Sequence, residues 1–137
     1  MSSGIVFVLV FIMKTFKDLI VWQKSVSIVY ITYRCTRFFP REELFGLTSQ
    51  IRRCAVSIPS NIAEGYGRRS TKDYVRFLNI SMGSLYELLT LLEVSYNLKF
   101  IDQKAYNEII KLTAEVGKML NTLITKIQHS NRQNTNL

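Results

Sequence analysis

The sequence predicts an all-α protein, an up-down-up-down antiparallel four-helix bundle. Apolar residues recur at steps of three and four positions along four long stretches of the 137-residue chain, and this spacing places side chains on one face of a helix. The connections between the stretches are short, and four long helices with short connections pack most simply as an antiparallel bundle. No segment favours a strand. A chain of this length forms one domain.

The first two predicted helices cover residues 18–38 and 47–64. The first ends before Pro40, because proline cannot continue a helix, and Pro59 lies inside the second. Their apolar stripes are Leu19, Trp22, Val26, Val29 and Tyr33, then Leu47, Ile51, Cys54 or Ala55, Ile58 and Ile62. We expect Gly65 and Gly67 to end the second helix and to form the following turn, where glycine tolerates a positive φ.

The third predicted helix starts at Ser70 and ends at Asn97. Ser70 and Asp73 have the spacing of a reciprocal N-terminal cap, and Asn97 is the expected left-handed stop. Asp102 caps the fourth helix, which runs to Ile127. The two stripes are Tyr74, Phe77 or Leu78, Ser81, Leu85, Leu88 and Leu92, then Tyr106, Ile109, Thr113, Val116, Leu120, Leu123 and Ile127. The bundle therefore covers residues 14–130, with a polar tail over 131–137.

Residues 1–13 form an apolar N-terminal extension. The run from Ile5 to Met13 has nine apolar residues, whereas crossing a bilayer takes roughly 20. A secretory signal would carry basic residues before the run, but Lys14 follows it. We expect Met13 to be the functional start, so that the extension is not native. With two cysteines in no metal or redox spacing, we expect a cytoplasmic protein that does not enter a membrane.

The basic residues are concentrated in one part of the chain. The chain has 18 Lys and Arg against 10 Asp and Glu, and nine of the basic residues lie between Arg34 and Arg76. Eight of these nine are arginine, whose planar fork suits phosphate. Four basic residues fall at the start of the third helix, where unpaired amides favour anions: Arg68, Arg69, Lys72 and Arg76. This pattern indicates a polyanion site, although many basic helix faces are only solvated surface.

A polar stripe follows the second predicted helix opposite its apolar stripe. It consists of Gln50, Arg53, Ser57, Asn61 and Glu64. Two interpretations fit it. The stripe could form a ligand groove, or it could be solvated and make hydrogen bonds between helices.

The apolar surface is wider than one bundle needs. A helix that is apolar nearly all round is buried on more than one side, so the excess indicates self-association into a homo-oligomer. The residues outside a single stripe are Ile20, Val21, Ile28 and Ile31, and Leu85, Leu88, Leu89, Leu91, Leu92 and Val94.

The residue types argue against an enzyme. His129 is the one histidine, and it lies near the polar end of the chain, so metal sites of the Cys/His type and Ser-His-Asp catalysis lack their residues. The ten acids show no spacing of a catalytic pair. We expect no catalytic residue, no metal and no cofactor.

The chain also resembles a known family. The run from Arg52 to Arg68, RRCAVSIPSNIAEGYGR, looks like the signature of the four-helix bundle proteins encoded within intervening sequences of bacterial 23S ribosomal RNA genes. Phe16–Lys24 is similar to that family's opening, and Tyr74–Glu87 is similar to its third helix. The resemblance covers Phe16–Ile127. Arg52, Arg53 and Arg68 match its basic signature residues, Asn61 and Glu64 its polar ones, and Cys54 stands where alanine is expected.

The family includes the accessory variability determinant of diversity-generating retroelements, a homopentameric barrel that binds nucleic acid and a reverse transcriptase. The resemblance therefore implies a ring-like homo-oligomer, a pentamer. We expect a non-catalytic protein that binds RNA or DNA phosphates, with Tyr66 and Tyr74 near the patch as candidate stacking residues. The expected contacts are Arg52, Arg53, Arg68, Arg69, Lys72 and Arg76. The alternative function is a protein-interaction scaffold or adaptor, for example for a reverse transcriptase, with incidental nucleic-acid binding.

Overall fold

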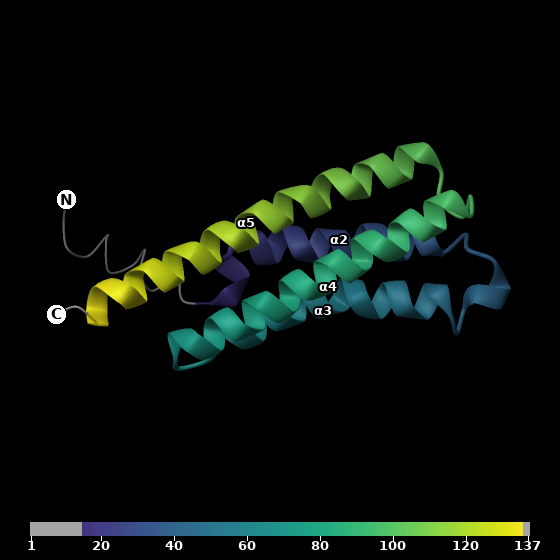
Figure 1. Cartoon of the computed structure of the whole chain (residues 1–137). Helices are drawn as coiled ribbons and strands as arrows, with labels where there is room; N and C mark the ends of the chain where they lie inside the picture. The colour runs from purple at the N-terminus through teal and green to yellow at the C-terminus, as the bar shows by residue number, and fades with distance from the viewer. Residues whose placement is uncertain (1–14, 136–137) are drawn as a thin grey trace.

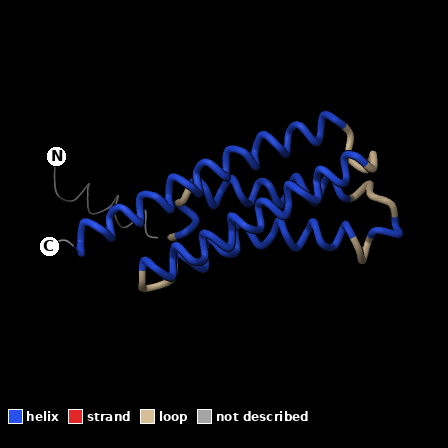
Figure 2. Tube along the Cα trace, in the orientation of Figure 1, coloured by secondary structure: helices blue, strands red, loops and turns tan. Residues whose placement is uncertain are grey.

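The computed structural model describes residues 15–135, which form four long helices and two short 3-10 helices without any strand. The elements in chain order are η1 (Phe16–Asp18), α2 (Ile20–Thr36), η2 (Arg41–Glu43), α3 (Leu47–Tyr66), α4 (Thr71–Asn97) and α5 (Gln103–Thr135). Short loops connect the helices (Figure 2). The prediction of an all-α protein with four long helices is confirmed. Residues 1–13, the expected apolar extension, lie outside the described residues.

Each long helix packs against two others. α3 contacts α2 and α4, and α5 contacts α4 and α2. The α2–α3 and α4–α5 connections lie at one end of the molecule (Figure 1), where the rings of Phe39 and Phe100 are 5.6 Å apart between centroids. The α3–α4 turn lies at the opposite end (Figure 1). All four helices contribute to one apolar core, so the position of each surface residue is fixed by a shared interior.

The expected apolar stripes of α3, α4 and α5 face this core, with Ile58, Leu88 and Val116 fully buried. The stripe predicted for α2 is offset from its most buried face: Leu19, Trp22 and Val29 pack against the core but are only partly buried. The buried residues of α2 are Val21, Ser25, Ile28, Thr32 and Thr36, whereas Tyr33 of the predicted stripe is 42% exposed. The reason is that Ser25 and Thr36 bury their hydroxyls by donating to carbonyl oxygens of their own helix, Trp22 at 2.7 Å and Thr32 at 2.8 Å.

Two helix ends differ from the sequence expectation. Asn97 is the last residue of α4, and the left-handed residue is Lys99, with φ of 64°. The Phe100 amide donates to the Ser95 carbonyl at 2.9 Å, which is the closing bond of a Schellman motif. α5 continues to Thr135, so residues 131–135 of the expected polar tail are helical and exposed.

Gly65 has a different role from the expected one. α3 continues through Gly65 to Tyr66, and no glycine among residues 15–135 has a positive φ. A Cβ at position 65 would lie 2.8 Å from Phe77 Cβ and 3.2 Å from the Tyr74 carbonyl oxygen. Gly65 is therefore required by the close approach of α3 to α4, not by a turn.

Among the described helices, α4 alone has the length and composition of a membrane span, with a mean hydropathy of 1.2 over its most apolar window. Core helices of soluble proteins often share this composition. The face of α4 that carries Leu78, Leu85 and Leu92 is buried against the other helices.

We predict that Gly65→Ala lowers the free energy of unfolding by about 1–3 kcal/mol, because the added methyl overpacks the contact with α4. Gly83→Ala is the matched control. Gly83 also lies inside a helix, but a Cβ there would meet nothing within 4 Å, so this change should stabilise by about 0.5–1 kcal/mol. Urea denaturation followed by circular dichroism measures both. Equal effects of the two variants would contradict the close contact at Gly65.

Candidate nucleic-acid interface

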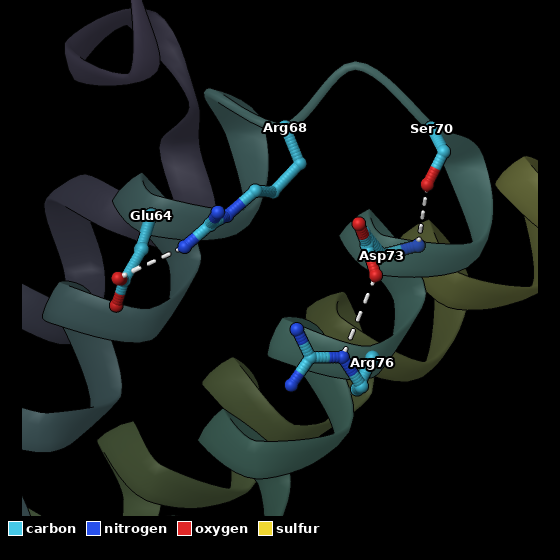
Figure 3. A network of polar contacts seen from close by, with 5 residues as sticks. All are labelled: Glu64, Arg68, Ser70, Asp73 and Arg76. Atoms are coloured by element: carbon cyan, nitrogen blue, oxygen red, sulfur yellow. Dashed lines mark hydrogen bonds and ion pairs between the residues drawn. The ribbon is translucent and has the colours of Figure 1, made fainter.

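The α3–α4 turn carries a network of charged side chains (Figure 3). The Ser70 hydroxyl accepts a hydrogen bond from the Asp73 amide at 3.1 Å, which confirms the Ser70 half of the predicted reciprocal cap of α4. The Asp73 carboxylate pairs with Arg76 Nε at 3.5 Å. On the other side of the turn, Arg68 pairs with Glu64 at 3.2 Å. The turn therefore orders two guanidinium groups with one carboxylate partner each.

Both of these guanidinium groups lie over the same aromatic ring. The Cζ atoms of Arg68 and Arg76 are each 4.6 Å from the centroid of the Phe77 ring. Phe77 is buried beside Gly65, with only 8% of its surface exposed. A guanidinium stacked on a ring loses conformational freedom yet keeps N–H donors at its edge. Phe77 thus holds two arginine side chains in place while leaving donors available.

Two further cations complete this surface. Arg69 and Lys72 are exposed, and neither forms an ion pair within the described part of the chain. Lys72 also lines a cleft of about 250 Å³ against the end of α5, with Gln128 and Asn131. We call Arg68, Arg69, Lys72 and Arg76 the α4 basic cluster. The N-terminus of α4 adds the partial positive charge of its free amides to these four cations.

The structure does not bring Arg52 and Arg53 into this cluster. Arg53 precedes Arg68 by 15 positions on α3 and its C-terminal turn, which is about 22 Å at the rise of a helix. Arg52 Nε donates to Thr36 Oγ1 at 2.9 Å, and its guanidinium lies 4.6 Å from the Tyr33 ring centroid. Arg52 therefore joins α3 to α2. Arg53 is exposed and lines a different cleft.

The polar stripe of α3 lies along α4, as the inter-helix interpretation expected. Ser57 Oγ and Ser84 Oγ are 2.8 Å apart, and Asn61 Nδ2 donates to both the carbonyl and the hydroxyl oxygen of Ser57, at 2.8 and 2.9 Å. Gln50 Nε2 donates to Glu87 Oε1 at 3.4 Å. The same region contains a cleft of about 340 Å³, which we call the α3–α4 polar cleft. It is lined by Gln50, Arg53, Cys54, Ser57, Ser84 and Glu87.

Cys54 forms part of the wall of this cleft. Its thiol donates to the Ser84 carbonyl at 2.9 Å. Burial, reinforced by the negative charge of Glu87, raises the pKa of Cys54 to about 12. Burial also raises the pKa of Cys35. Both thiols therefore stay protonated near neutral pH and are poor nucleophiles.

The aromatic residues near the cluster have different environments. The Tyr66 and Tyr74 rings meet edge to face at 6.3 Å between centroids. Tyr74 is half-buried and packs against the core, and this burial raises its pKa. The sequence did not identify Phe77, Ser84 or Glu87 as site residues, because their importance depends on the register of α4 against α3. The described residues contain no group of three His, Cys, Asp or Glu side chains that could hold a metal ion.

Comparisons with known proteins agree with this fold. The family described as 23S rRNA-intervening sequence protein matches residues 17–122. The chain is also similar to the crystal structure of a protein of unknown function from the S23 ribosomal protein family of Bacteroides thetaiotaomicron, with 27% identity and a TM-score of 0.72. That similarity covers 77% of this chain and 96% of the other. A search of curated proteins gave no match.

We predict that Cys54 alkylates very slowly in the folded protein. With a pKa of about 12 in place of 9.0, the thiolate fraction at pH 8 falls about 1,000-fold. In a Cys35→Ser variant, the rate of reaction with iodoacetamide should rise about tenfold per pH unit from pH 8 to 11, whereas the urea-unfolded chain should level off above pH 9. A plateau near pH 9 in the folded protein would contradict the packing of this thiol.

Proposed function

The chain belongs to the 23S rRNA-intervening sequence protein family, and on this premise we propose that it is a non-catalytic protein that binds the phosphates of RNA or DNA. The observation that carries the proposal is the pair of guanidinium groups, Arg68 and Arg76, stacked over Phe77 at 4.6 Å. The proposed protein acts in the cytoplasm, without a cofactor and without entering a membrane. Its contacts are the α4 basic cluster, with Arg53 at a separate position.

The chemistry of the cluster suits a phosphate chain. Each arginine uses part of its five-donor fork on Glu64 or Asp73, and the remaining N–H groups can donate to phosphate oxygens. Arg69 and Lys72 add charge that no carboxylate within residues 15–135 pairs with. Cations condensed on the nucleic acid would be released when these side chains neutralise its phosphates, so affinity should fall steeply with salt.

We further propose that the protein is a ring-like homo-oligomer of up-down-up-down bundles, a pentamer, as the family resemblance implies. Support comes from an open apolar cleft of about 330 Å³ between α2 and α3, lined mainly by Trp22, Val26, Val29, Val56 and Pro59. Tyr30, on its edge, is 72% exposed. A second copy is the occupant that the symmetry of a ring supplies. Each copy would present one α4 basic cluster, and repeated weak sites add through avidity.

The alternative function is a scaffold or adaptor for a protein partner such as a reverse transcriptase. One observation favours it. At the end of the molecule opposite the α3–α4 turn, Phe38 is 79% exposed and Phe45 is 93% exposed. Exposed aromatic residues are frequent in protein interfaces. A protein partner docked on this end would leave nucleic-acid binding incidental.

We predict that Arg68→Glu, Arg69→Glu and Lys72→Glu together abolish nucleic-acid binding at physiological salt and leave only weak binding at low salt. Fluorescence anisotropy with structured RNA and duplex DNA across a salt series measures this. The slope of log affinity against log salt should fall in magnitude by about 2–3, since each lost phosphate contact removes about one.

The control for this triple variant is Arg37→Glu, Arg41→Glu and Lys104→Glu, which changes the net charge equally at exposed positions near the opposite end. It should retain most of the affinity. Equal losses in both triple variants would mean that only net charge matters. Binding by the wild type that is insensitive to salt would favour the scaffold.

We predict that Tyr30→Asp dissociates the oligomer, because it places a charge in the apolar cleft between α2 and α3. Sedimentation equilibrium should show the wild type as an oligomer of five chains and this variant as a monomer. Thr125→Asp, at an exposed position of α5, should leave the assembly intact. A monomeric wild type would overturn the proposed ring.

A further inference from the structure

The α3–α4 polar cleft contains a cation and an anion that do not pair with each other. Arg53 is exposed and forms no ion pair or hydrogen bond within the described residues. Glu87 lines the same cleft, accepts from Gln50 Nε2 at the long distance of 3.4 Å and lies beside the Cys54 thiol. A carboxylate accepts at two oxygens. The cleft therefore offers a guanidinium fork without an ion-pair partner together with a carboxylate that keeps part of its acceptor capacity.

The polar groups at the floor of the cleft already have hydrogen-bond partners. The hydroxyls of Ser57 and Ser84 bond to each other at 2.8 Å, and the Cys54 thiol donates to the Ser84 carbonyl. Asn61 Nδ2 closes the neighbouring end by donating to Ser57. The hydrogen-bonding groups that remain for a ligand lie at the rim: Arg53, Gln50 and Glu87. Its volume of about 340 Å³ is within the roughly 300–1,000 Å³ range of small-molecule sites.

A ligand for this rim must present acceptors on one edge and donors on another. Guanine does so, because O6 and N7 accept while N1–H and the N2 amine donate. Adenine presents an acceptor at N1, which a carboxylate repels, and uracil has one donor and no N7. We propose that the α3–α4 polar cleft binds a single unpaired guanine, with Arg53 donating to O6 and N7 and Glu87 accepting from N1–H and the N2 amine.

This inference rests on the proposed function, since the guanine belongs to the nucleic acid held by the α4 basic cluster. The position suits that arrangement. Arg53 lies about 22 Å from Arg68 along α3, a distance that a few nucleotides of an extended single strand can span. An unpaired base is required, because the Watson–Crick edge is free only in loops and single strands. The cluster would hold the phosphates while the cleft selects the base.

The test uses the full-length protein and three fluorescent 12-nucleotide RNAs. One is uridine throughout, one carries a single central guanosine, and one carries inosine there, which differs from guanosine only by lacking the N2 amine. The wild type should bind the guanosine RNA about tenfold more tightly than the inosine RNA, within the range of one bidentate base contact. The uridine RNA should bind through phosphates alone.

Single variants test the contributions of Glu87 and Arg53 separately. Glu87→Gln removes one carboxylate acceptor and should abolish the difference between guanosine and inosine, whereas Glu42→Gln, at an exposed position of η2, should preserve it. Arg53→Lys keeps the charge but lacks the fork. It should reduce the preference for guanosine over uridine.

The outcomes distinguish the inference from the proposed function. Equal, salt-sensitive binding of all three RNAs would overturn the guanine site and leave phosphate binding in place. A guanosine preference that survives in Glu87→Gln would also overturn the site, because the carboxylate would not be reading the base. Absence of binding to every RNA at low salt would overturn both proposals.

Discussion

The close packing of α3 against α4 is the constraint on which the rest of the structure depends. Small residues stand where the helices meet: Gly65 faces Phe77 with no room for a Cβ, and Ser81 Oγ donates to the Ile58 carbonyl at 2.9 Å. Ser57 and Ser84 bond across the same contact. Close backbone approach and buried hydrogen bonds have strict geometry, so together they fix the register of one helix against the other.

That register places both candidate binding features. At one end, it places the Phe77 ring of α4 against the guanidinium of Arg68, which belongs to the α3–α4 turn. Arg76, which directly precedes Phe77 in α4, lies over the same ring. Farther along α3, it sets Glu87 beside Gln50 and in the same cleft as Arg53. A shift of one residue between the helices would rotate these side chains away from one another. Packing in the interior therefore determines recognition at the surface.

The arginines show that equal residue types have different roles according to their surroundings. Arg52 bonds to Thr36 and stacks on Tyr33, which makes it a link between α2 and α3. Its neighbour Arg53 is exposed, lines a cleft and forms no ion pair among the described residues. Surface ion pairs such as Arg68 with Glu64 are worth about 0–1 kcal/mol, so a phosphate can replace the carboxylate at small cost.

The sequence by itself determined the four helices, the apolar stripes of three of them and two N-terminal caps, because helical periodicity and capping are local properties. The Ser70 hydroxyl accepts from the Asp73 amide, and the Asp102 carboxylate accepts from the Ala105 amide at 2.8 Å. The sequence did not identify the buried face of α2, because this face contains the polar residues Ser25, Thr32 and Thr36. The Ser25 and Thr36 hydroxyls donate to carbonyl oxygens of their own helix, and Thr32 is packed in the core.

Only the tertiary structure decided that Gly65 serves the contact between α3 and α4 and that Arg52 joins α3 to α2. Only the fold could bring Phe77 and Glu87 into the two candidate sites. The physical reason is that these properties depend on the distance and register between helices. Periodicity within one helix carries no information about either quantity.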